Sequence, residues 1–397
     1  MKRIASIDIF RALTMMLMIF VDDLWTLHDV PRWLDHAGAR EDRMGLADVV
    51  FPAFLFIVGL SIPFALKGRE KKARQDNQGR IKTKAAVFLH ILGRSLALIV
   101  MGFFFVNHEY YRPDVDFFTR KIRLVFMVAA FFLIWNDYRT NRLLKVIPVR
   151  ALQGLGVLTL GALAYFYKGG AVENPQGMSP HWWGILGLIG WAYLVCSSLY
   201  LLIGNRLSIA ALFTAVFYVL NVQEFRPVAG VHGFKLIVGA SNYALVMSGV
   251  LTTIIYLKLN RLKKEFFLPL ALGVLGVSAL WFGFATRPLW GISKIFATPS
   301  WTTICAGISL LTYALVYLVS DIANLTRWAG PLMPAGRSSL TCYLLPGLVY
   351  TLFSPQLMLL PYQLSGSTLG ILKSFLFTCA IVFIVWILEK ARIRIKL

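Results

Sequence analysis

Residues able to do chemistry are concentrated near the N-terminal end of the chain. Asp8 and Arg11 lie three residues apart in an apolar stretch, and Asp22 and Asp23 follow near the end of the same stretch. A spacing of three places Asp8 and Arg11 on one face of a helix, where they can form a structural ion pair or take part in a binding site. Ionisable groups within a membrane span are costly and by default indicate function. We therefore expect at least one of the two adjacent carboxylates to face a cavity.

A histidine-containing segment follows this stretch and supplies a candidate catalytic pair. His36 lies in the segment 28–47, and Asp48 comes directly after it, at the start of the next apolar stretch. Imidazole exchanges a proton near neutral pH, which suits a general base. A loop histidine is more often a solvated side chain, and Asp48 can also cap the helix that begins there. The spacing alone leaves both interpretations open.

Basic and hydroxyl side chains also occur within or beside three later apolar stretches. Arg94 lies inside one of them, where it can hold an anion or extend toward the membrane surface. Lys294 lies in the segment GISKIFATPSWTT, around a helix start, and Arg337 and Ser338 belong to the segment AGRSSLTCYLLP. A hydroxyl-rich helix opening can bind an anion through its backbone N–H groups, and it can equally serve helix capping and packing.

The composition indicates which elements must position these residues. Of the 397 residues, 58% are apolar and only 15% are charged, and the mean hydropathy is +0.68. A soluble domain is about one quarter charged, so this chain has too few charged residues to cover an apolar core in water. The net charge of +21 is typical of nucleic-acid-binding proteins, but such a protein would not be this apolar. We predict a polytopic membrane protein whose partners include lipids and no nucleic acid.

Apolar stretches long enough to cross a bilayer recur along the whole chain. A bilayer core needs roughly 20 apolar residues in a helix, and the sequence contains eleven or twelve such stretches. We predict one all-α transmembrane domain over residues 1–397. The predicted spans are 9–27, 48–66, 85–106, 122–137, 147–167, 183–203, 206–221, 240–257, 266–285, 300–320, 336–353 and 368–389.

The positions of lysine and arginine predict the orientation of these spans. With an even number of spans, the loops on the side of the two termini hold about twice as many of the 40 basic residues as the loops on the other side. Cytoplasmic loops carry the excess of basic residues, so both termini are predicted to be cytoplasmic. The basic run 67–84 is then a cytoplasmic loop that contacts anionic lipid, and the segment 28–47 is an outer loop.

Several familiar catalytic motifs do not occur in the sequence. It contains no GxxxxGK[ST] phosphate-binding loop, no HExxH zinc motif, no Cys/His metal spacing and no GxSxG nucleophile elbow. All the cysteines lie in apolar segments, so we expect buried thiols that form neither a disulfide nor a metal site. They are Cys196, Cys305, Cys342 and Cys379.

Two long segments resemble a known enzyme family. SIDIFRALTMMLMIFVDD and LDHAGAREDRMGLADVVFPAFLFIVGLSI resemble the heparan-α-glucosaminide N-acetyltransferase family, and more closely its bacterial relatives in the transmembrane acyltransferase superfamily. ILGRSLAL, SKIFATPSW and GRSSLTCY resemble further segments of that family, whereas the middle of the chain, roughly 140–290, is similar only in hydropathy. The residues that match the main motifs are Asp8, Arg11, His36, Gly45, Leu46, Asp48, Phe51, Pro52, Phe54, Gly59 and Ser61.

The chain also departs from the family pattern. His36 precedes Asp48 by twelve residues, whereas the family histidine precedes its aspartate by ten. Asp22 stands where the family has an asparagine, and the family's Pro-Gly-Val-Leu-Gln-Arg segment is missing at 123–128. A carboxylate at position 22 can titrate or pair with a cationic acceptor, which an amide cannot do.

The resemblance implies acyl transfer across the membrane of a bacterial cell. The donor would be cytoplasmic acetyl-CoA, and the acceptor an amine or hydroxyl of a sugar or glycan on the periplasmic side of the inner membrane. Arg11, Arg94 and Arg337 would contact the phosphates of CoA, with Ser338 and Lys294 completing the donor site.

The resemblance also implies roles for the residues of the outer side. His36 would act as general base or carry the acyl group covalently, and the sequence does not distinguish the two mechanisms. Asp48 or Asp22 would orient the imidazole and stabilise its charged form. No metal is expected, and the sequence is compatible with a homodimer.

Two other function classes remain open. A transporter or flippase would use the buried carboxylates and arginines as substrate and proton sites without covalent chemistry, although no internal repeat relates the two halves of the chain. A structural membrane anchor would use the run 67–84 to bind a partner or lipid.

Overall fold

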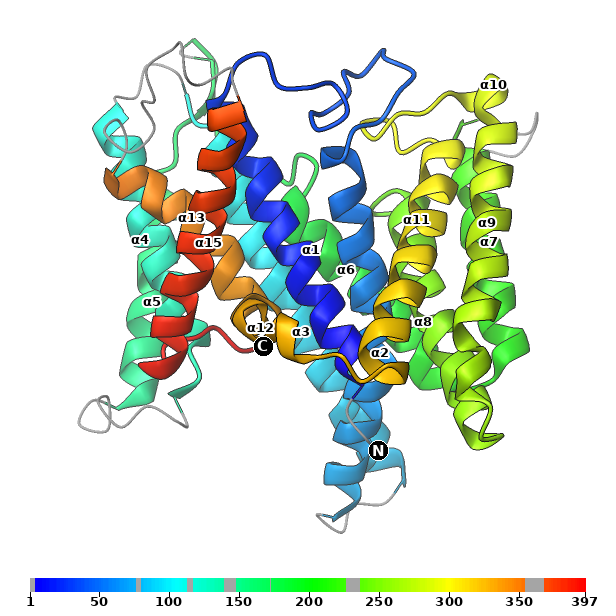
Figure 1. Ribbon diagram of the computed structural model, residues 1–397. Coiled ribbons are helices and arrows are strands. Elements are labelled where there is room, and N and C mark those ends of the chain that lie inside the picture. The colour runs from blue at the N-terminus through cyan, green and yellow to red at the C-terminus, as the bar shows by residue number, and fades with distance from the viewer. Residues whose placement is uncertain are drawn as a thin grey trace.

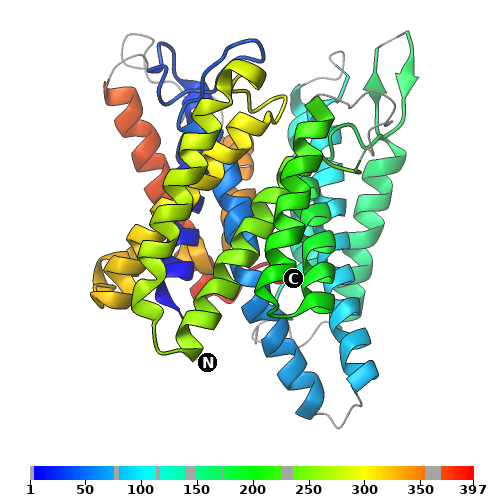
Figure 2. The ribbon, with the colours of Figure 1, turned by 90° about the vertical axis from the view of Figure 1, so that its right-hand side faces the viewer.

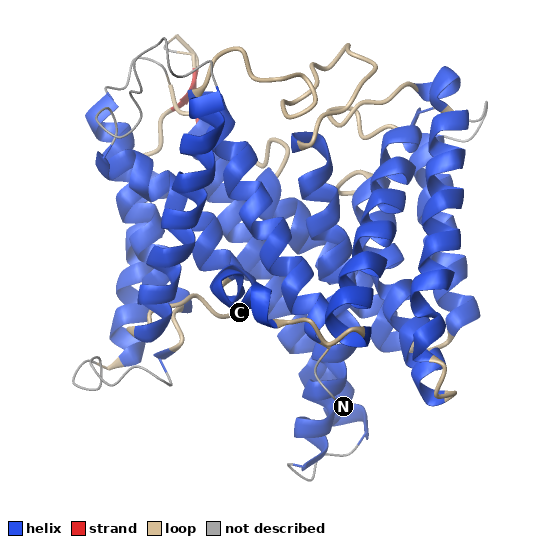
Figure 3. Cartoon of the chain, viewed as in Figure 1, coloured by secondary structure: helices blue, strands red, loops and turns tan. Residues whose placement is uncertain are grey.

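The computed structural model is an upright bundle of helices with one very short hairpin, β1 (Gly169–Gly170) and β2 (Pro175–Gln176) (Figures 1 and 3). It therefore belongs to the all-α class that the sequence predicts. The structure describes residues 4–75, 80–112, 117–138, 148–171, 173–225, 236–353 and 368–397.

Every predicted span falls on a helix. Within the described residues, eight helices (α2, α3, α6, α7, α8, α9, α11 and α15) are long and apolar enough to cross a membrane. The remaining predicted spans coincide with α1 and α4, which carry more charge, and with α5 and α13, which are shorter. The main helices are α1 (Ala5–Asp23), α2 (Ala47–Gln75), α3 (Arg80–Glu109), α4 (Phe117–Trp135), α5 (Val149–Tyr165), α6 (Gly184–Ile203), α7 (Leu207–Phe225), α8 (Ala240–Arg261), α9 (Leu268–Ala285), α11 (Pro299–Tyr317), α13 (Ser339–Phe353) and α15 (Thr368–Lys390).

Shorter elements connect these helices. A 3₁₀ turn, Leu24–Thr26, extends α1, and Glu265–Phe267 precedes α9. A π-helical turn, Leu318–Ile322, extends α11. The remaining short elements are α10 (Arg287–Trp290), a 3₁₀ helix at Arg327–Leu332 and α12 (Met333–Arg337).

The prediction that 67–84 forms a loop is wrong for most of that segment. α2 continues to Gln75 and α3 begins at Arg80, so the two helices extend beyond their apolar stretches and project from the lower end of the bundle (Figure 1). Lys, Arg, Glu and Gln are good helix formers, so the helix does not have to end where the apolar pattern ends.

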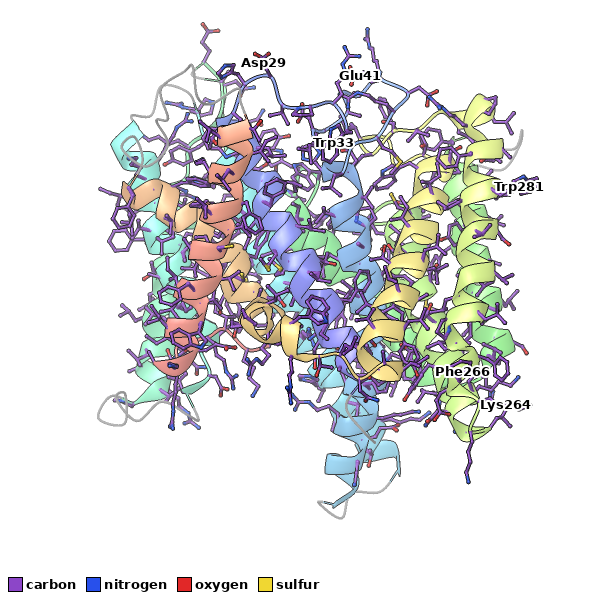
Figure 4. The ribbon with its side chains drawn as sticks, in the orientation of Figure 1. Asp29, Trp33, Glu41, Lys264, Phe266 and Trp281 are labelled. Carbon is purple, nitrogen blue, oxygen red and sulfur yellow. The ribbon has the colours of Figure 1, made fainter. Side chains whose placement is uncertain are left out.

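Glycine allows the central helices to approach closely. A Cβ atom at Gly59 on α2 would lie 1.9 Å from the carbonyl oxygen of Val246 on α8, and one at Gly249 would lie 2.0 Å from the carbonyl oxygen of Phe56. Small residues at such crossings are typical of helices packed in lipid. α8 is largely buried, whereas α7, α9 and α15 direct many large apolar side chains outward, including Trp281 (Figure 4). An apolar outer surface of this kind suits contact with lipid chains.

The two ends of the bundle differ in what they carry. The long loop between α1 and α2 covers the upper end in Figures 1 and 2, and Asp29, Trp33 and Glu41 mark it in Figure 4. Lys264 lies at the opposite end, as do the first described residues of the chain (Figures 1 and 4). Both marked chain ends lie toward the lower end of the bundle (Figure 1), so His36 is far from the termini.

Candidate functional site

His36 and Asp48 are in direct contact at the N-terminal end of α2. His36 Nδ1 lies 2.8 Å from Asp48 Oδ1. The second oxygen, Asp48 Oδ2, accepts the backbone N–H groups of Ala37 at 2.9 Å and Gly45 at 3.0 Å. Asp48 therefore holds the loop and the imidazole, and these bonds differ from the helix cap that its position also allowed.

The contact with Asp48 determines which imidazole nitrogen is available for chemistry. A carboxylate can only accept a hydrogen bond, so the contact with Asp48 selects the tautomer in which Nδ1 of His36 donates and Nε2 keeps its lone pair. In that tautomer Lys294 Nζ, 3.2 Å from Nδ1, acts on the imidazole by its charge and not as a hydrogen-bond donor to it. The Asp48 side chain is only 1% exposed, whereas that of His36 is 48% exposed. His36 thus offers an accessible proton acceptor that is oriented by a buried carboxylate.

Glycine gives the loop the shape that this contact requires. A Cβ atom at Gly45 would lie 1.9 Å from the carbonyl oxygen of Asp35, so another residue would push these backbone segments apart. The next two N–H groups, of Leu46 and Ala47, donate to the carbonyls of Trp33 and Leu34 at 2.7 and 3.1 Å. The loop therefore folds back on itself just before α2 and brings His36 over the start of the helix.

Lys294 joins this pair from the segment between α10 and α11. Its Nζ lies 3.2 Å from His36 Nδ1 and 3.9 Å from Asp48 Oδ1. Burial lowers the pKa of Lys294, while the charges of Asp48 and Asp22 raise it, and the net effect is a lowered pKa. The sequence predicts Lys294 for the donor site, and the structure places it beside the histidine, because a loop 258 residues later in the chain folds onto the same end.

Asp22 and Asp23, adjacent in sequence, have different surroundings. Asp22 is accessible at the end of α1 and interacts electrostatically with Lys294 and His36. Asp23 is fully buried and forms an ion pair with Lys373 of α15, whose Nζ lies 2.9 Å from Oδ2. Asp22 therefore belongs to the His36 cluster, and Asp23 ties α1 to α15.

A second ion pair, between Asp42 and Arg287, joins the two loops that form the cluster. Arg287 Nε donates to Asp42 Oδ2 at 2.9 Å, and Ile292 N donates to Asp42 Oδ1 at 2.6 Å. Neither residue is among the site residues predicted from the sequence. Arg287 directly after an apolar helix was the available signal, but its partner, 245 residues away, depends on the fold.

A large cavity lies among α1, α2, α3 and α6. It has a volume of about 860 Å³, and apolar side chains of α1, α2, α3 and α6 line much of it. Its basic lining residues are Arg11, Lys67, Lys71, Arg94, Arg337 and Lys396. The three arginines predicted to contact CoA thus line one cavity, whereas Lys294 and Ser338 do not.

Local contacts hold these arginines in place. Arg11 Nη1 lies 3.3 Å from Asp8 Oδ1, so the two residues pair as their spacing predicts, and Arg11 Nη2 donates to Ser61 Oγ at 2.6 Å. The guanidinium of Arg94 lies over the ring of Tyr193 on α6, 4.8 Å from its centroid.

Ser338, also predicted for the donor site, lies outside the lining of the cavity. Its hydroxyl is buried and donates to Glu389 Oε1 on α15 at 2.7 Å. In this structure the hydroxyl therefore joins two helices.

α1 and α2 connect the cavity to the His36 cluster. Met18 lines the cavity and precedes Asp22 by four residues, about 6 Å of helix rise. Phe54 also lines it and follows Asp48 by six residues, about 9 Å of rise. Residues that line the cavity are thus separated from the His36 cluster by one to two helical turns on α1 and α2.

The structure also bears on the cysteines and on metal binding. Cys196, Cys305 and Cys342 are buried as predicted, and Cys379 is partly exposed. Among the residues that the structure describes, no three His, Cys, Asp or Glu side chains are arranged to hold a metal ion.

The geometry combines two chemical capacities. An imidazole oriented by a carboxylate and flanked by an ammonium group can move a proton and stabilise negative charge. A basic cavity with apolar walls suits an anionic molecule that has an apolar part. In comparisons with known proteins, no protein-family model matches the chain, and no curated protein matches its sequence.

Proposed function

We propose that the protein is a membrane-embedded acyltransferase that moves an acetyl or other acyl group from cytoplasmic acyl-CoA to an amine or hydroxyl of a sugar or glycan on the periplasmic side. The observation that carries the proposal is the placement of a basic cavity and the His36 cluster along the same two helices, α1 and α2. The motif resemblance adds the acyl donor. The orientation rests on the excess of basic residues on the side of the termini.

The cavity has the chemistry that an acyl-CoA needs. Its volume of about 860 Å³ lies within the range of roughly 300–1,000 Å³ that is common for sites of organic ligands. Arg11, Arg94 and Arg337 can pair with phosphate oxygens, and the apolar walls suit the uncharged arm that carries the thioester. Arg94 Nε is buried and has no hydrogen-bond partner within the described part of the chain, so a donor is left for a ligand.

The His36 cluster supports the transfer step. The acceptor amine or hydroxyl attacks the thioester carbonyl, its new bond to the acyl carbon forms, and Nε2 of His36 takes its proton. The C–S bond then breaks, and the CoA thiolate leaves and is protonated by the imidazolium. Asp48 stabilises the imidazolium, and the ammonium group of Lys294 stabilises the developing oxyanion.

A covalent route uses the same residues. Nε2 of His36 attacks the thioester carbonyl, the C–S bond breaks, and CoA leaves as the thiolate. The acceptor then attacks the acyl-imidazole, the bond between Nε2 and the acyl carbon breaks, and the proton that the acceptor loses balances the one that the CoA thiolate takes up. In either route Asp22 has a distinct use, because a sugar amine arrives as an ammonium ion. A carboxylate at the end of α1 can bind that ion and take its extra proton before attack.

A CoA-release assay tests the proposal. Purified protein in proteoliposomes is given acetyl-CoA and a panel of amino sugars and glycans, and the free thiol is measured. We expect one class of acceptor to release CoA, with His36→Ala reducing the rate by at least about a hundredfold. His28→Ala, in the same loop, is the control and should keep wild-type turnover.

Two results would overturn the proposal. One is wild-type turnover in His36→Ala, which removes the residue from the reaction. The other is the absence of acetyl-CoA binding to the purified protein together with movement of a labelled sugar across the vesicle membrane, which is the behaviour of a transporter.

A further inference from the structure

Arg123 is a buried cation that the proposed reaction does not use. It lies on α4 and is only 5% exposed. Its Nη1 donates to the carbonyl of Leu163 at 2.7 Å. Its guanidinium carbon lies 4.9 Å from the ring centroid of Tyr111 and 5.2 Å from that of Tyr167. The two ring centroids are 5.4 Å apart, so the guanidinium packs against a corner formed by both rings.

One edge of this guanidinium has no carboxylate or phosphate against it among the described residues. Nε and Nη2 of Arg123 are buried there without a hydrogen-bond partner, and the favourable side-chain interactions of the guanidinium are with Tyr111 and Tyr167. These two nitrogens form the edge by which an arginine grips a carboxylate or phosphate through two parallel hydrogen bonds. Buried polar groups are otherwise almost always satisfied, and a buried charge needs a counter-charge.

Two more side chains with nitrogen atoms lie beside Arg123. His108, at the end of α3, is close enough to Arg120 and Arg123 for both charges to act on it. His108 Nδ1 and Arg120 Nε are buried without a hydrogen-bond partner among the described residues. Glu109 directly follows His108 in the sequence, and no electrostatic interaction joins it to Arg123. Four buried nitrogens without a hydrogen-bond partner thus lie on three neighbouring side chains, with no carboxylate interacting with Arg123 among the described residues.

We propose that Arg123, with His108 and Arg120, forms a binding site for an oxyanion: a phosphate or carboxylate group supplied by a ligand at the outer end of the bundle. The site lies next to the β1–β2 hairpin, at the same end as the loop that carries His36 (Figures 1 and 2). The same chemistry suits the head group of an anionic lipid and a soluble phosphate or carboxylate. The inference does not depend on the proposed acyl transfer.

Thermal unfolding with two sources of phosphate tests the site. Detergent-solubilised protein is titrated with inorganic phosphate against sodium chloride of equal ionic strength, and in parallel the protein is placed in phosphatidylglycerol or phosphatidylcholine nanodiscs. We expect phosphate, phosphatidylglycerol or both to raise the Tm. Arg123→Lys keeps the charge but loses the two-bond edge, so it should need at least about tenfold more phosphate for the same shift. Arg150→Gln, at an exposed arginine of α5, is the control.

The phosphate titration and the nanodisc measurement together identify the source of the ligand. A response to phosphatidylglycerol alone identifies a lipid head group, and a response to free phosphate identifies a soluble anion. Equal shifts in Arg123→Lys and wild type, or no shift in either arm, would overturn the site. Asp114 and Asp116 lie outside the described residues. A phosphate response that appears only when both are changed to Asn would assign the counter-charge to the chain itself and also overturn the proposal.

Discussion

Arg287 grips Asp42 with two hydrogen bonds, one to Oδ2 at 2.9 Å and one to the backbone carbonyl at 2.8 Å. The aspartate belongs to the loop that carries His36, and the arginine belongs to the segment that carries Lys294. This ion pair therefore fixes the distance between the histidine and the lysine, although neither Arg287 nor Asp42 touches His36.

The acid stability of the outer loops should depend on Asp42. Burial alone would raise the pKa of Asp42, but hydrogen bonds from Arg287 and Ile292 lower it overall. A carboxyl group with a lowered folded-state pKa stabilises the fold above its unfolded value of about 3.9, and this contribution is lost as the pH falls through the folded-state pKa. Asp42→Asn should therefore lower the Tm at neutral pH, and the difference from wild type should shrink below about pH 4. Asp29→Asn, at an exposed position, is the control, and a difference that does not change with pH would contradict the ion pair's role.

Asp48→Asn should abolish the orientation of the imidazole with little loss of the fold. The amide oxygen can still accept the N–H groups of Ala37 and Gly45, but the amide NH₂ then faces His36 Nδ1. Nδ1 becomes an acceptor, so Nε2 carries the proton and can no longer take one. We expect kcat for CoA release to fall by about two to four orders of magnitude with a Tm near that of wild type. Asp35→Asn is the matched control, because Asp35 Oδ1 accepts the backbone N–H of His36 and an amide oxygen can accept the same bond. Full activity in Asp48→Asn would refute the orienting role.

Lys294 should set the alkaline limb of the pH–rate profile. Its lowered pKa means that it loses its charge below about 10.4, the usual value for lysine. If the ammonium stabilises the oxyanion, the rate should fall as Lys294 is deprotonated, and Lys294→Arg should move that limb to higher pH. Lys294→Met should reduce kcat by about a hundredfold or more without a comparable change in KM for acetyl-CoA. A profile in Lys294→Arg that overlays wild type would exclude the lysine as the titrating group.

Local patterns account for most of the fold and for part of the site. The apolar stretches locate the helices because each must satisfy its own backbone hydrogen bonds in lipid, and this requirement is local. The sequence places His36 and Asp48 together in the same way, since only twelve residues separate them. The sequence does not predict that α2 continues to Gln75 and that α3 already begins at Arg80. The apolar pattern does not cover these residues, although they still favour a helix.

Contacts between residues far apart in the sequence cannot be predicted from local patterns. Lys294 reads as part of a donor site because its neighbours resemble a closing segment of the enzyme family, yet tertiary packing brings it to His36. The predicted span 122–137 includes Arg123, but hydropathy does not reveal its surroundings: it is buried on α4, where it packs against two aromatic rings and donates to the Leu163 carbonyl. Neither position follows from charge or spacing, since each depends on which helix ends meet.

The loop that carries His36 should tolerate alanine at Gly38 and reject it at Gly45. A Cβ atom at Gly38 would meet only the side chain of Glu41, at 3.6 Å, whereas one at Gly45 would lie 1.9 Å from the backbone oxygen of Asp35. Overpacking against backbone costs about 1–3 kcal/mol, and it would pull the Gly45 N–H away from Asp48. We expect Gly45→Ala to lower the Tm and to reduce CoA release at least about tenfold, with Gly38→Ala close to wild type. Similar activity in the two variants would show that the tight return of the loop does not position His36.

The Asp23–Lys373 pair should be a stability element with no catalytic role. The Asp23 side chain is fully buried, and it also accepts a hydrogen bond from the hydroxyl of Tyr350. Lys373→Met leaves that carboxylate buried without its cation, a change that costs about 3–5 kcal/mol in comparable pairs. We expect a large loss in the free energy of unfolding for Lys373→Met, a partial recovery in the double variant Asp23→Asn/Lys373→Met, and little effect of Lys390→Met at an exposed lysine of the same helix. Denaturant unfolding in detergent measures all three. A double variant no more stable than Lys373→Met would show that the loss does not arise from the unpaired carboxylate, because removing that charge should relieve most of the penalty.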